Sequence, residues 1–120
     1  MKLQQSAENY LETILILSQK STIVRSIDIV NELDFSKPSV SVAMKKLREN
    51  GFINVNGDGY ITLTQTGKDI AESMYDKHKT LSEFLISLGV CEAVAKDDAC
   101  KIEHIISQES FLKIKEFLEK

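Results

Sequence analysis

The stretch FINVNGDGYITL (residues 52–63) decides the fold. Two short apolar runs, residues 52–55 and 60–63, flank the polar sequence Asn56-Gly57-Asp58-Gly59. Asn-Gly and Asp-Gly pairs favour the tight turns that join antiparallel strands. The stretch therefore predicts a β-hairpin.

Three helical patterns precede this hairpin. Apolar residues recur at helical spacing over residues 6–18 and 27–33, and Ser26 is the expected N-cap of the second pattern. Pro38 is tolerated in a first helical turn, so we expect a third helix from Lys37 to Asn50, ended by Gly51. Three helices and a hairpin form a winged helix-turn-helix, in which the third helix reads DNA. The alternative is a mixed α+β core without a ligand.

The chain after the hairpin predicts three more helices. A long helical pattern begins after Thr64, which can cap it, and runs to Leu88 before Gly89. A second pattern covers residues 92–106, and a third begins at about residue 108 after the possible cap Ser107. The predicted fold is mostly α with a small β-hairpin: an N-terminal winged helix-turn-helix over residues 1–66 and a C-terminal helical domain over residues 67–120.

Composition indicates an ordinary globular protein, with 42% hydrophobic and 28% charged residues. No stretch is long and apolar enough to cross a bilayer, and no apolar signal-peptide core follows residues 1–5. We therefore expect a cytoplasmic protein that does not enter a membrane. Its two cysteines, Cys91 and Cys100, are then expected to be reduced thiols.

The net charge of −3 at first argues against nucleic acid, but the charge is unevenly distributed. Residues 1–70 carry equal numbers of acidic and basic side chains, so the deficit lies in residues 71–120. Within residues 35–50, Lys37, Lys45, Lys46 and Arg48 outnumber the single acid Glu49. Such a basic segment can contact phosphates, because these contacts act over short distances.

Besides the basic segment, the sequence Cys100-Lys101-Ile102-Glu103-His104 indicates a possible metal site. On a helix, positions i, i+3 and i+4 share one face, so a thiol, a carboxylate and an imidazole point the same way. These side chains bind late first-row divalent metals. Taken singly, Cys100 could be a small buried apolar residue, Glu12 a solvated carboxylate on an amphipathic helix and His78 an exposed polar residue.

The chain resembles the diphtheria-toxin-repressor / manganese-transport-regulator family of metal-dependent transcriptional repressors. The resemblance covers nearly the whole chain and is carried by residues 8–14, 36–41, 63–68, 77–78 and 100–104. It implies a homodimer in which residues 67–120 form a metal-binding and dimerisation domain. It also implies that metal-loaded dimers bind palindromic double-stranded operator DNA and repress metal-uptake genes.

The resemblance implies metal ligands from three helices: Asn9, Glu12, His78, Cys100, Glu103 and His104. The implied metal is Fe(II) or Mn(II), and Co(II), Ni(II) and Zn(II) are expected to bind in vitro. Binding to residues so far apart in sequence couples metal binding to one domain arrangement.

Several positions depart from the family pattern. Asn9 offers a neutral oxygen where relatives have Asp or Met, and Cys100 agrees with the iron-type members. Ser82 and Lys96 stand where relatives with an ancillary metal site have Glu and His, so we expect one principal site. The SH3-like domain of the longer members is expected to be absent.

The expected DNA-reading surface is the start of the third helix, where short hydroxyls and apolar groups suit thymine methyls and phosphates. The expected DNA-binding residues are Ser36, Lys37, Pro38, Ser39, Ser41, Val42, Lys45 and Lys46.

Two other functions compete with a metal-sensing repressor. One is a winged-helix regulator that senses redox state or a small ligand through Cys91 and Cys100. The other is a small metallohydrolase with Glu103 or Glu12 as base. No substrate loop, phosphate-binding glycine motif or nucleophile elbow accompanies those carboxylates, so we expect no enzyme activity.

Overall fold

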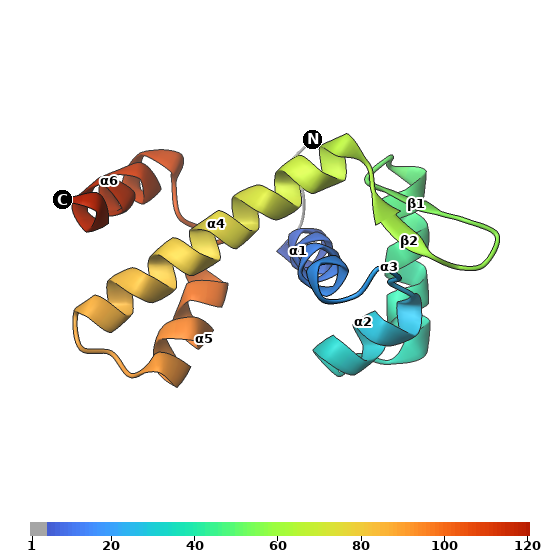
Figure 1. Cartoon of the computed structure of the whole chain (residues 1–120), viewed down its shortest axis with the longest axis horizontal. Coiled ribbons are helices and arrows are strands. Elements are labelled where there is room, and N and C mark those ends of the chain that lie inside the picture. The colour runs from blue at the N-terminus through green and yellow to red at the C-terminus, as the bar shows by residue number, and fades with distance from the viewer. Residues whose placement is uncertain (1–4) are drawn as a thin grey trace. The chain divides into compact units, whose positions relative to one another are not determined.

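The computed structural model describes residues 5–120, and its elements follow one another from blue to red in Figure 1. The first four residues of the predicted DNA-binding domain lie outside this range. The chain divides into two compact units, residues 1–72 and 73–120, and the boundary falls inside one helix.

The first unit contains three helices, a hairpin and the start of a fourth helix. Its elements are α1 (Gln5–Lys20), α2 (Ser26–Leu33), α3 (Lys37–Glu49), β1 (Ile53–Val55), β2 (Ile61–Leu63) and the start of α4 (Gln65–Ser87). Residues Leu11, Ile14, Ile29, Val40 and Ile53 are fully buried and form its core. They come from all three helices and the hairpin, as expected for a winged helix-turn-helix.

The hairpin forms as predicted, with Ile53 opposite Leu63 and Val55 opposite Ile61. In its turn, the Asn56 Oδ1 atom accepts hydrogen bonds from the backbone N–H groups of Asp58 and Tyr60, each at 2.9 Å. Gly59 adopts a positive φ of 81°, which glycine reaches without strain. The Asn-Gly-Asp-Gly sequence therefore supplies both the side-chain acceptor and the left-handed residue that this turn needs.

The start of α4 lies close to the backbone of residue 52. Thr64 caps the helix as predicted, since its Oγ1 accepts from the N–H of Gly67 at 3.2 Å. The same hydroxyl donates to the Gly51 carbonyl at 2.7 Å, and the Thr64 N–H donates to the Phe52 carbonyl at 3.1 Å. A Cβ atom on Gly67 would lie 2.0 Å from that carbonyl oxygen, so only glycine fits there.

The second unit contains the rest of α4 followed by α5 (Glu92–Ile102) and α6 (Gln108–Glu119). Its buried apolar residues include Leu81, Ala95, Ala99 and Phe111. Ser107 caps α6 as predicted, accepting from the Ser110 N–H at 3.1 Å.

Two helix ends differ from the prediction. The N-cap of α2 is Arg25 rather than Ser26, because the Asp28 carboxylate accepts the Arg25 backbone N–H at 2.8 Å and fixes the first turn there. Helix α5 ends at Ile102 instead of Ile106, because the N–H groups of Ile105 and Ile106 both donate to the Ile102 carbonyl in a tightened turn. Glu103 and His104 therefore lie in the turn that follows α5.

In residues 5–120, no helix has the length and apolar character needed to cross a bilayer.

Candidate metal centre

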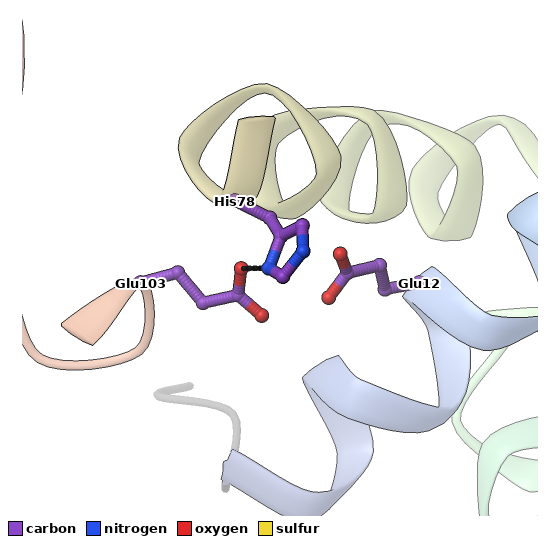
Figure 2. Close-up of side chains that lie close together, drawn as sticks. All are labelled: Glu12, His78 and Glu103. Carbon is purple, nitrogen blue, oxygen red and sulfur yellow. Dashed lines mark ion pairs between the residues drawn. The ribbon is translucent and has the colours of Figure 1, made fainter. Parts of the chain in front are cut away.

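An imidazole and a carboxylate of the second unit face each other (Figure 2). His78 lies midway along α4, and its Nδ1 atom is 3.2 Å from the Oε2 atom of Glu103. The Glu103 side chain is fully buried, while that of His78 is 29% exposed. Helix α4 therefore places His78 beside Glu103, which directly follows α5.

The other oxygen of the same carboxylate faces a second imidazole. The Nε2 atom of His104 lies 3.3 Å from Oε1 of Glu103, and the His104 side chain is only 2% exposed. Glu103 keeps helical φ and ψ values of −58° and −26°, and the two neighbouring side chains meet in the turn that follows α5. Each Glu103 oxygen thus has an imidazole nitrogen beside it.

These close atoms do not form well-aligned hydrogen bonds. Both Glu103 oxygens and the His78 Nδ1 atom are buried, and none has a hydrogen-bond partner among residues 5–120. The short distances therefore place imidazole nitrogens beside the Glu103 carboxylate without a satisfied hydrogen-bond network. A buried carboxylate without hydrogen bonds is unfavourable unless a positive charge compensates it.

The donor set fits a divalent transition metal. Imidazole nitrogens and a carboxylate oxygen are ligands that Mn(II), Fe(II) and Zn(II) accept in proteins. A bound cation would neutralise the Glu103 carboxylate and accept the lone pairs that find no hydrogen bond. His78 and Glu103 are therefore the candidate core of a metal centre, and His104, beside the other Glu103 oxygen, is a further candidate ligand.

Cys100 lies on α5 one turn before Glu103, is half-buried and forms no disulfide within residues 5–120. The other cysteine, Cys91, is exposed at the N-cap of α5. The structure leaves the role of Cys100 as a ligand a prediction.

The remaining two predicted ligands belong to α1 of the first unit. Glu12 is buried, with 5% of its surface exposed, which is unusual for a carboxylate on an amphipathic helix. Asn9 is half-buried, and its backbone carbonyl accepts from the Thr13 hydroxyl at 2.8 Å. Figure 2 labels Glu12 on its own helix.

The predicted DNA-reading helix is exposed along its polar face. Ser36 is its N-cap and accepts from the Ser39 N–H at 3.2 Å, while Pro38 lies in its first turn. Val40, Met44 and Leu47 are buried on the opposite face. The side chains predicted to meet DNA are all exposed, namely Ser36, Lys37, Pro38, Ser39, Ser41, Val42, Lys45 and Lys46.

Comparison with known protein families agrees with the candidate metal centre and with the predicted DNA-reading helix. Residues 2–61 match the N-terminal DNA-binding domain of iron-dependent repressors, and residues 64–120 match the metal-binding and dimerisation domain of the same repressors. The chain belongs to the iron-dependent repressor family. Members of this family are metal-dependent transcriptional repressors, so the predicted family and winged-helix fold are confirmed.

The chain covers different shares of the length of its individual relatives. The chain is 36% identical over 120 residues to an HTH-type transcriptional regulator of Methanocaldococcus jannaschii, covering 98% of this chain and 96% of the relative. It is 32% identical over 103 residues to the transcriptional regulator MntR of Salmonella typhimurium, covering 86% of this chain and 66% of MntR.

A solved structure of a manganese-dependent transcriptional repressor in complex with manganese is also similar. It matches with a TM-score of 0.86 and 27% identity over 94% of this chain. The chain spans 52% of the length of that repressor.

Proposed function

We propose that the chain is a homodimeric repressor that binds operator DNA when loaded with Fe(II) or Mn(II) and so controls metal-uptake genes. The observation that carries this proposal is the buried Glu103 carboxylate, which faces imidazoles on both oxygens and lacks hydrogen bonds among residues 5–120. The same chain carries an exposed, basic DNA-reading helix. Family membership joins the two features in one regulator.

For the metal ligands, we propose the six side chains Asn9, Glu12, His78, Cys100, Glu103 and His104. His78 and Glu103 are supported by the short distance between them, His104 by its contact with the other Glu103 oxygen, and Glu12 by its burial. Asn9 contributes a neutral oxygen and is the weakest member. We retain residues 1–66 and 67–120 as the proposed DNA-binding and metal-binding domains.

Regulation then follows from where these residues lie in the chain. Asn9 and Glu12 belong to the helix that opens the DNA-binding domain, whereas the other four lie on α4 or at α5. Residues from both domains that share one cation would stabilise one domain arrangement, and DNA binding would in turn tighten metal binding.

Exposed apolar side chains of the second unit support the homodimer. Leu88, Ile105, Leu112 and Phe117 have between 45% and 78% of their surface exposed. A lobe of 48 residues that leaves this much apolar surface open gains stability by pairing with a second copy.

Metal dependence is tested by a gel-shift titration of the DNA upstream of the chain's own operon. We expect retardation with Mn(II), or with Fe(II) under anaerobic conditions, and none in excess chelator. A duplex of unrelated sequence serves as control and should bind much more weakly. Binding that ignores chelator but responds to thiol oxidants would favour the redox regulator instead, and metal-independent binding would overturn the proposal.

Cys100 is expected to set the choice between metals. A thiolate favours Fe(II) over Mn(II), whereas a carboxylate favours the harder cation. We therefore expect Cys100→Glu to lower the Mn(II) concentration needed for half-maximal DNA binding relative to Fe(II). The matched control is Cys91→Ser at the exposed cysteine, which should change neither value. An unchanged metal preference in Cys100→Glu would remove Cys100 from the ligand set.

A further inference from the structure

The base of the hairpin is attached to the start of α2. The Ile61 N–H donates to the Val24 carbonyl at 2.7 Å, so the residues just before α2 run beside β2. Val24 is buried there, while the next residue, Arg25, is exposed. This backbone contact places the side chain of Arg25 beside that of Tyr60, which directly precedes β2.

The two side chains make a double contact. The Arg25 Nη2 atom donates to the Tyr60 hydroxyl at 3.0 Å, and the guanidinium carbon lies 4.7 Å from the centre of the Tyr60 ring. A cation over an aromatic face gains electrostatic stabilisation, and a planar guanidinium stacks well. These two contacts favour one orientation of Arg25 although it is exposed.

The positive charge of Arg25 is held without being neutralised. Its guanidinium makes no ion pair with a carboxylate of residues 5–120. The nearby Asp28 carboxylate accepts the backbone N–H of Arg25 instead. Tyr60 satisfies one guanidinium N–H with a neutral oxygen, which leaves the others available to an anion.

We propose that Arg25 and Tyr60 form a phosphate-binding pair that grips the DNA backbone beside the wing. Arg25 donates its remaining N–H groups to a phosphate oxygen. Tyr60, whose oxygen already accepts from Arg25, orients the guanidinium and has its O–H free to donate to the same phosphate. This inference rests on the proposed function and adds a contact outside the DNA-reading helix.

The salt dependence of DNA binding tests the pair directly. Each phosphate neutralised by a cationic side chain contributes about 0.9 to the slope of log K against log salt. In a dimer, Arg25→Gln should therefore reduce the magnitude of that slope by about 1.8. It should also weaken binding about tenfold or more at 0.1 M salt. The probe is a fluorescent duplex of the upstream DNA at saturating Mn(II), followed by anisotropy.

Three further variants separate recognition from bracing of the hairpin. Arg25→Lys keeps the charge, so the slope should be retained. Tyr60→Phe keeps the ring but loses both hydroxyl contacts, so affinity should fall about threefold to tenfold at an unchanged slope. Lys113→Gln removes one exposed cation of α6 and should leave the slope unchanged.

The outcomes distinguish this inference from the proposed function. An unchanged slope in a folded Arg25→Gln protein, with wild-type binding intact, would overturn the phosphate contact alone. Unaltered affinity in Tyr60→Phe would remove Tyr60 from the pair. If Arg25→Gln does not fold, Arg25→Lys serves as the test. A reduced slope of log K against log salt in that variant would contradict the inference. Failure of the wild-type protein to bind the duplex with metal would overturn the proposed function, and this inference with it.

Discussion

Glu103→Gln is expected to abolish metal-activated DNA binding while leaving the metal-free protein folded. The substitution keeps the volume of the side chain and removes the charge that both imidazoles face. Loss of one direct ligand should weaken metal binding by at least about a hundredfold, since even partners outside the ligand shell contribute about ten- to a hundredfold. Calorimetric titration with Mn(II), followed by the gel shift, measures both effects.

The stability of the metal-free Glu103→Gln protein should not fall along with its metal affinity. The buried Glu103 oxygens lack hydrogen bonds within residues 5–120, so their charge is poorly compensated when no cation is present. Replacing it with a neutral amide should leave the free energy of unfolding in chelator within about 1 kcal/mol, or raise it. Glu83→Gln, at an exposed carboxylate of α4, is the control and should alter neither property. A Glu103→Gln protein with wild-type metal affinity would contradict the ligand assignment.

Gly67→Ala should destabilise the DNA-binding unit more than any other single methyl addition at a glycine of this chain. The new Cβ would lie 2.0 Å from the Phe52 carbonyl oxygen, a backbone atom that cannot rotate away. Removing this clash requires α4 to shift away from Phe52. That shift would break the hydrogen bonds made by Thr64. We expect a loss of about 3 kcal/mol. That corresponds to a fall in melting temperature on the order of 15 °C.

Gly57→Ala provides the matched control for this prediction. A Cβ at Gly57 meets no atom within 4 Å, and its φ is not in the left-handed region. The melting temperature should therefore stay the same or rise slightly, because alanine restricts the unfolded chain. Thermal melts followed by circular dichroism compare the two proteins. Similar melting temperatures for both variants would show that α4 can move from Phe52 at little cost.

Local signals account for most of the fold that was predicted from the sequence. The hairpin turn, the caps Thr64 and Ser107, and the Pro38 start of α3 each depend on residues within four positions of one another. Such short-range preferences can be identified from neighbouring residues alone. The Ser26 cap was wrong because the Arg25 backbone N–H donates to the Asp28 carboxylate, which makes Arg25 the N-cap.

The parts that the sequence did not predict depend on contacts between distant residues. The helical spacing of Cys100, Glu103 and His104 predicted one regular helix face, whereas α5 ends at Ile102 and the last two residues lie in the turn that follows it. The Arg25–Tyr60 contact joins residues 35 positions apart. No periodicity in the sequence marks such a pair, because its formation depends on how the hairpin packs beside α2.

The uninterrupted course of α4 also restricts how this chain can change in length. Gly67, fixed beside Phe52, and His78 lie on the same helix, eleven residues apart, and the sequence between them contains neither glycine nor proline. At 3.6 residues per turn, inserting or deleting one residue there would rotate His78 by about 100° relative to Gly67. We therefore expect insertions and deletions in this segment to be tolerated less well than in the loops between helices.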